Sequence, residues 1–167
     1  MEAEDIFLAK ARPEDWKDLY QNVWSREETA RYMLWQVTKG EQAARERMER
    51  TIAYQKEHDA WLIYQKSTGR AIGFAGIKEI SPAVYEDTGI ALGPEYVGRG
   101  YGKHVLRLLL EHCCRQGANT FYYSTRTDNL PSNRLALSMG FFLCRCEAAV
   151  DPRNGEAYER KVYLRFL

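Results

Sequence analysis

The sequence has no long run of apolar residues and no basic leader. No apolar stretch approaches the roughly 18–20 residues that a transmembrane helix needs. The first residues, Met1–Asp5, are acidic, whereas a secretory signal needs a basic start followed by a long apolar core. We therefore expect a cytoplasmic protein that does not enter a membrane.

An excess of charge of either sign is also missing. The 167 residues include 24 Lys and Arg against 23 Asp and Glu. Because proteins that bind nucleic acid or anionic membranes usually present a broad basic face, this balance argues against both kinds of partner. The hydrophobic fraction of 45% is that of a globular chain with a core.

Motifs for metal binding are absent as well. The four cysteines, Cys113, Cys114, Cys144 and Cys146, form no C-x-x-C pair, and the three histidines show no ligand spacing. We therefore expect no metal site. We interpret the cysteines as small, buried apolar residues.

No repeat or Pro/Ser-rich linker interrupts the chain, so residues 1–167 are predicted to form a single domain. Hydrophobic periodicity and turn residues predict an α/β fold with the order β-α-α-α-β-β-β-α-β-α-β-β. Pro13 suits the start of the first helix, and Ser25 has Glu28 at capping-box spacing for the second. The expected strands cover 6–11, 60–65, 71–80, 84–92, 120–124, 141–150 and 158–166, and the expected helices begin near 13 and 25 and cover 41–57, 101–116 and 131–139.

A glycine-rich segment, Gly98–Lys103, comes directly before the strongest predicted helix. The first amides of a helix have no partner inside it, and the helix dipole favours negative charge at that end. Glycine lets a phosphate approach the backbone without meeting a Cβ atom, and Arg99 and Lys103 add positive charge. The segment is therefore predicted to bind a diphosphate.

Two common phosphate-binding motifs do not fit this segment. A nucleotide P-loop ending at Lys103 would need Gly at Val97 and Ser or Thr at His104. A dinucleotide fingerprint would need Gly at Lys103 or at Val105. A flexible turn between a strand and a helix, with no ligand, is the remaining alternative.

A third motif fits. The segments Gly93–Lys103, Asn129–Ser132 and Met139–Phe141 together resemble the GCN5-related N-acetyltransferase (GNAT) superfamily. Gly100 and Gly102 hold the last two defined places of its acetyl-CoA loop. Within the superfamily, the sequences of these motifs are similar to those of the ribosomal-protein-alanine (RimJ/RimL-type) N-acetyltransferase branch. The resemblance implies acetyl-CoA as co-substrate and a mixed, mostly antiparallel sheet flanked by helices.

The resemblance also implies which residues contact the coenzyme. Val97 stands where the family usually has Gln or Arg, so Arg99 or Lys103 must compensate. A backbone amide near Ile90–Leu92 is implied to polarise the thioester carbonyl, and Asn129 to bind the amide-rich arm. The full implied set is Ile90, Ala91, Leu92, Val97, Gly98, Arg99, Gly100, Tyr101, Gly102, Lys103, Asn129 and Ser132.

Acetyl transfer requires a neutral amine, so a base must remove a proton near neutral pH. Asp87 is the first candidate because similar sequences carry an acid two residues before a Gly; Glu86 is the second and Glu79 the third. Glu86 and Asp87 should face opposite sides of the sheet. A base acting through a water molecule is an alternative.

A side-chain acid for the departing thiolate is less clearly marked. The family's Tyr is replaced by Ala136, so Ser132 is the candidate, although a Ser early in a helix is often only a cap. A thiol with a pKa near ~8.5 can also leave without an acid. Tyr122 and Tyr123 alternate on the next strand and are interpreted mainly as core residues, with one of them lining the pocket as the alternative.

The acceptor is the least defined part of the prediction. The resemblance suggests a peptide N-terminus or an amine-bearing small molecule, and Tyr32 and Trp35 are weak candidates for contacting it. The expected function is direct acetyl transfer from acetyl-CoA to a primary amine. A catalytically idle coenzyme A sensor is the alternative, and either a monomer or a homodimer is compatible with the sequence.

Overall fold

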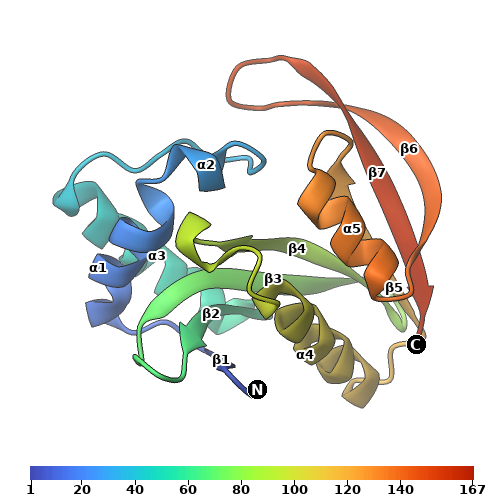
Figure 1. Cartoon of the computed structure of the whole chain (residues 1–167), viewed down its shortest axis with the longest axis horizontal. Helices are drawn as coiled ribbons and strands as arrows, with labels where there is room; N and C mark the ends of the chain where they lie inside the picture. Colours follow the sequence, from blue (N-terminus) through green and yellow to red (C-terminus); the bar gives the residue numbers. More distant parts are fainter.

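A computed structural model describes all residues, 1–167. One seven-stranded sheet runs through the molecule in the order β1-β2-β3-β4-β5-β7-β6, and every neighbouring pair is antiparallel except β4–β5 (Figure 1). This confirms the predicted α/β fold with a mixed, mostly antiparallel sheet. The strands are β1 (Ile6–Ala9), β2 (Ala60–Gln65), β3 (Ala71–Ser81), β4 (Val84–Leu92), β5 (Thr120–Arg126), β6 (Phe142–Val150) and β7 (Ala157–Phe166).

The helices follow the predicted order. They are α1 (Trp16–Leu19), α2 (Glu27–Ala30), α3 (Glu41–Glu57), α4 (Tyr101–Arg115) and α5 (Leu130–Ser138). A 3-10 turn precedes α1, a π-helical turn over Tyr20–Trp24 follows it, and another 3-10 turn covers Pro94–Tyr96. None of the helices combines the length and the apolar character needed to cross a bilayer.

Two local expectations were wrong. The predicted capping box at Ser25 does not form: α2 begins after Arg26 without a side-chain cap, and the Ser25 hydroxyl donates to the Tyr20 carbonyl at 2.7 Å, which closes the π-helical turn. Of the cysteines, only Cys113 is buried. Cys144 and Cys146 are exposed because they lie on β6, the edge strand of the sheet.

Two hydrophobic cores lie on opposite faces of the sheet. Alternation along β2 sends Trp61 and Ile63 into the core under α4, and Leu62 and Tyr64 into the core under α1 and α3. Helix α5 packs against β5 on the α4 side, where Ala136 is fully buried. Each face of the sheet is therefore covered by its own group of helices.

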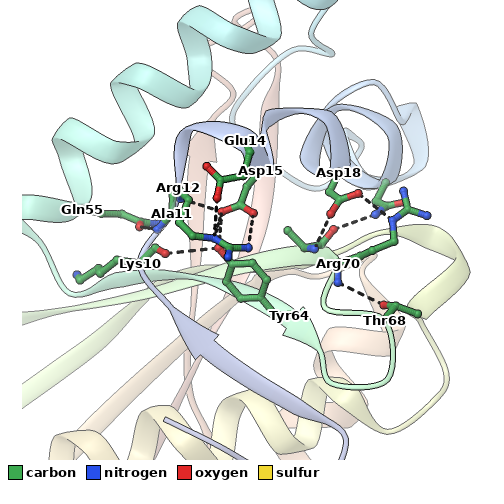
Figure 2. Close-up of polar contacts among 12 residues, drawn as sticks. Lys10, Ala11, Arg12, Glu14, Asp15, Asp18, Gln55, Tyr64, Thr68 and Arg70 are labelled. Carbon is green, nitrogen blue, oxygen red and sulfur yellow. Dashed lines mark hydrogen bonds and ion pairs between the residues drawn. The ribbon is translucent and has the colours of Figure 1, made fainter.

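Polar contacts, including a buried hydrogen bond between Tyr64 and Asp15, fix the N-terminal helical segment to the sheet (Figure 2). The Asp15 carboxylate is 3% exposed, pairs with the Arg12 guanidinium at 3.0 Å, and accepts the Tyr64 hydroxyl at 2.5 Å. Next to it, Asp18 accepts from the Arg70 side chain at 2.8 Å. These contacts fix the chain segment that leads into α2 against strands β2 and β3 of the sheet.

Substituting Tyr64 with Phe is therefore expected to destabilise the protein. The change leaves the buried Asp15 carboxylate one donor short, which costs about 1.5–3 kcal/mol for a hydrogen bond to a charged group. Urea unfolding measures the loss, with Tyr54→Phe as the control because Tyr54 is 46% exposed. Equal stability of Tyr64→Phe and wild type would contradict this role for the pair.

Candidate active site

The site begins where two neighbouring strands separate. The parallel pairing of β4 with β5 covers only Val84–Glu86 against Thr120–Tyr122. Beyond Glu86 the strands separate, and the backbone groups of β4 that point toward β5 have no strand partner. The Asp87 carboxylate lies at the point of separation, where its Oδ1 atom accepts the Ser124 amide at 2.9 Å.

A β-bulge shapes β4 immediately after this point. Gly76 pairs with Gly89 and Ile77 with Asp87, which leaves Thr88 as an extra residue. Gly89 has a φ of 123°, a conformation that favours glycine, and a Cβ on Gly76 would lie 2.4 Å from the Thr88 hydroxyl oxygen. The bulge bends β4 away from β5 and widens the gap between them.

The loop before α4 presents a row of free amides. Gly98 and Gly100 have φ values of 79° and 84°, and space surrounds both Cα atoms. None of the amides of residues 98–102 donates to an acceptor in the chain. They stand at the N-terminus of α4, where the sequence predicts that a diphosphate binds.

A cavity of about 560 Å³ extends from this loop along β4 to α5. Most residues of the implied coenzyme set line it: Ile90, Ala91, Leu92, Val97, Gly98, Gly100, Gly102, Lys103, Asn129 and Ser132. The other two do not. Arg99 lies beside the Tyr96 ring, and the Tyr101 side chain is buried in the core, where its hydroxyl accepts from Gln65 at 3.1 Å.

A second cavity, of about 340 Å³, lies at the same gap and is lined from the α1–α3 side by Trp35 and Phe74. Asp87 lines this cavity and not the first. The two cavities share six lining residues, which mark where their contents would meet: Tyr32, Met33, Ile90, Tyr123, Asn129 and Ser132.

The Ser132 hydroxyl lies at this meeting point. Asn129, not Ser132, caps α5, because its side-chain oxygen accepts the Ser132 amide at 3.3 Å. The Ser132 hydroxyl is therefore free to bond the Tyr123 hydroxyl, 2.7 Å away. Burial, followed by the charge of Asp87, raises the pKa of Tyr123, which keeps its proton.

The sequence favoured core packing for Tyr122 and Tyr123 and left a pocket position for one of them as the alternative; for Tyr123 the structure shows both. Tyr123 is buried, but it lines both cavities and its hydroxyl bonds Ser132. The alternation of β5 places Tyr123 on the face that α5 covers, directly opposite the Asn129–Ser132 motif. Combining that alternation with the motif could have identified Tyr123.

The three candidate bases occupy different surroundings. Burial raises the pKa of Asp87 to about 7, with a smaller contribution from the negative charge of Glu86, while the Ser124 amide opposes the shift. Glu86 pairs with Lys78 at 2.7 Å and lines neither cavity. Glu79 accepts the Ala83 amide in the β3–β4 turn. This placement favours Asp87 over the two glutamates.

The acceptor-side wall depends on contacts between distant parts of the chain. Tyr32 and Trp35, the residues predicted to contact the acceptor, both line the second cavity. The Arg153 guanidinium, in the β6–β7 turn, donates to the carbonyls of Ala30 and Trp35 at 2.9 and 3.2 Å and is paired with Asp151.

No group of three His, Cys, Asp or Glu side chains could hold a metal ion.

Comparison with known proteins defines the class. Residues 5–142 match the model of the acetyltransferase (GNAT) domain. The chain therefore belongs to the GNAT acetyltransferase family, which confirms the resemblance noted in the sequence.

Two curated relatives match parts of the chain. The chain is 39% identical over 79 residues to the N-alpha-acetyltransferase RimI of Mycobacterium tuberculosis, covering 46% of this chain and 48% of RimI. A second match, to an uncharacterized Mycobacterium leprae protein, covers 24% of that protein. The chain thus spans less than half the length of the curated relatives it matches.

Solved structures show the same fold. A GNAT-family acetyltransferase from Bacillus anthracis aligns with a TM-score of 0.85 at 16% identity, covering 99% of this chain and 97% of its own. The ribosomal L7/L12 alpha-N-protein acetyltransferase RimL, solved in complex with coenzyme A, aligns with a TM-score of 0.81 at 22% identity, covering 99% and 96%.

Proposed function

We propose that the protein is an acetyl-CoA-dependent N-acetyltransferase that moves the acetyl group directly to a primary amine. The observation that carries this proposal is the row of unpaired amides at residues 98–102, which opens into a cavity that ends beside Ser132. Asp87 lines the second cavity, which shares Ser132 with the first. Free amides, a cavity and a carboxylate with a raised pKa in neighbouring positions support this proposal.

The residues present fit the coenzyme. The amides of 98–102 and the Lys103 ammonium bind the diphosphate, and the open edge of β4 at Ile90–Leu92 offers hydrogen bonds to the amides of the coenzyme's arm. Asn129 lines the opposite wall. Bound acetyl-CoA supplies a thioester, whose carbonyl carbon bonds to the amine and whose sulfur leaves as the thiol.

The chain's own residues manage the protons of this reaction. Asp87 takes the proton that the amine loses as the C–N bond forms, and a pKa of about 7 keeps it deprotonated at slightly alkaline pH. The Ser132 hydroxyl gives a proton to the sulfur as the C–S bond breaks and takes one from the Tyr123 hydroxyl through their hydrogen bond. Tyr123 then regains a proton from water, and Asp87 returns its proton to water, so both residues are restored. One amine proton is therefore lost and one thiol proton gained.

A peptide N-terminus is the acceptor that the relatives support best. RimI is named an N-alpha-acetyltransferase, and RimL is described as acting on the N-terminus of ribosomal L7/L12. An α-amine has a pKa near ~8, closer to that of Asp87 than the ~10 of a lysine side chain, so proton transfer between them is less uphill.

Coenzyme binding is expected to depend on Lys103. Replacing it with Ala should raise the Kd for coenzyme A about 10-fold, since a charge-assisted hydrogen bond contributes roughly 1.5 kcal/mol. Isothermal titration calorimetry measures the change. Arg115→Ala is the control, because it removes a similar charge from the exposed last turn of the same helix. Undetectable binding to wild type would overturn the proposal.

Turnover is tested by following thiol release from acetyl-CoA with a panel of short peptides and small amines. Release with peptides that have a free N-terminus, but not with their N-acetylated forms, would support transfer to an α-amine. Coenzyme binding without turnover for every acceptor would instead identify a sensor.

A further inference from the structure

A third cavity adjoins the acceptor side of the site. It has a volume of about 340 Å³ and lies between α3 and strands β2–β4. It shares Trp35, Phe74, Thr88 and Gly89 with the cavity that contains Asp87. The third cavity and the cavity that contains Asp87 therefore adjoin at the Thr88–Gly89 bulge.

The third cavity is cationic and has no counter-charge. Arg47 and Arg50 of α3 line it, and both also line an adjoining hollow together with Lys39. No Asp or Glu lines either space. None of the three cations forms an ion pair with a carboxylate of the chain.

Arg47 is held in place without being neutralised. Its guanidinium lies 4.7 Å from the centre of the Trp24 ring and 4.4 Å from that of Trp35, and it donates to the Thr38 hydroxyl at 2.8 Å. Burial, followed by the nearby charge of Arg50, lowers the pKa of Arg47 to about 10. The indole nitrogen of Trp35 is buried and has no acceptor.

We propose that this cavity binds an anionic group, a carboxylate or a phosphate, carried by the acceptor at a distance from its amine. Arg47 is a fixed, bidentate donor for such a group, Arg50 adds a mobile second charge, and the aromatic walls accommodate the connecting atoms. This inference rests on the proposed function, because it assigns a substrate class to the same acceptor site.

Peptides that have already been acetylated test the inference by binding alone. The probes are N-acetylated peptides that begin with Ser and differ only in their second residue. A peptide with Glu at this position is compared with its neutral match, Gln, and a peptide with phosphoserine is compared with unmodified Ser. Affinity is measured by calorimetry in the presence of coenzyme A. We expect each anionic peptide to bind at least about 10-fold more tightly than its match at low salt, with the ratio falling as salt is added.

Variants on one helix locate the effect. Arg47→Gln should bring the ratio of the affinities for the anionic and the neutral peptide close to one. Arg50→Gln should reduce this ratio several-fold, and it should not disturb folding, because Arg50 is exposed. Arg45→Gln is the matched control: it removes the same charge from α3, but Arg45 lies over the Trp16 ring and lines neither space. Its ratio should equal that of wild type.

The outcomes separate this inference from the proposed function. Equal affinity of wild type for anionic and neutral peptides, or an undiminished preference in both Arg47→Gln and Arg50→Gln, would overturn the inference even if acetylation is observed. An Arg-dependent preference without any acetyl transfer would support the anion subsite and contradict the enzymatic function. A preference for only one anion would identify the group as a carboxylate or a phosphate.

Discussion

Replacing Asp87 with Asn is expected to lower kcat by about 10²- to 10⁴-fold, the usual contribution of a positioned general base. The amide has the size of the carboxylate and can still accept the Ser124 amide, but it cannot take a proton from the amine. Thiol release from acetyl-CoA measures the rate, and calorimetry should show coenzyme affinity within about twofold of wild type, because Asp87 does not line the coenzyme cavity.

The pH dependence identifies the role of Asp87. Its base form is the deprotonated one, so kcat/KM of the wild type should fall as the pH drops through about 7. The Asn variant should lack this acid limb. Its low activity should not come from unfolding. Because the pKa of Asp87 is higher in the folded state, ionisation of the carboxylate lowers the free energy of unfolding as the pH rises from ~4, the unfolded pKa, to about 7. The Asn variant has no carboxylate to ionise and therefore avoids this loss. Thermal unfolding at pH 8 should show no loss of stability.

Glu86→Gln is the matched control for Asp87→Asn. Glu86 is the next residue along β4, and its carboxylate pairs with Lys78 outside both cavities. The control should keep kcat within about twofold of wild type. An equal loss of activity in Glu86→Gln would place the base on the other face of β4 and contradict our assignment.

The second large effect is expected for the hydroxyl pair beside the thioester position. Ser132→Ala removes the proposed proton donor to the sulfur, and Tyr123→Phe removes the group that supplies Ser132. Each variant should lose about 10²-fold in kcat, the low end for acid catalysis, because a thiolate leaves fairly well without help. Steady-state thiol release measures both.

The double variant distinguishes one proton relay from two separate effects. If Ser132 and Tyr123 act together, the double variant should be no slower than the slower single variant. Tyr122→Phe, on the opposite face of β5, is the control and should retain its activity. Independent, multiplicative losses would show that the two hydroxyls do not form a relay.

Sequence reasoning located the regular elements well because their signals are local. The predicted bounds of α3 and β4, 41–57 and 84–92, are those of the structure. The glycine spacing before α4 likewise identified a loop whose free amides line a cavity. In each case a short window contains both the periodicity and the residues that end the element.

The remaining features depend on neighbours that are distant in the sequence. Cys144 and Cys146 are exposed because β6 is an edge strand, a fact set by the order of all seven strands. Tyr123 belongs to the candidate site because its hydroxyl bonds Ser132 of α5. The cationic cavity went unnoticed because the lack of a counter-charge beside Arg47 cannot be read from α3 alone.

The short pairing between β4 and β5 has a consequence for how the molecule holds together. Within the sheet, three residue pairs join a lobe made of β1–β4 to a lobe made of β5–β7, and the seam between β4 and β5 has no further strand pairing. The core under α4 and the Asp87–Ser124 hydrogen bond are the other links between the two lobes near this seam. A ligand with amides spaced along a flexible arm would close this seam by bonding both lobes at once. Occupancy and rigidity would then be thermodynamically linked, so that the loaded protein resists separation of its halves more strongly than the empty one.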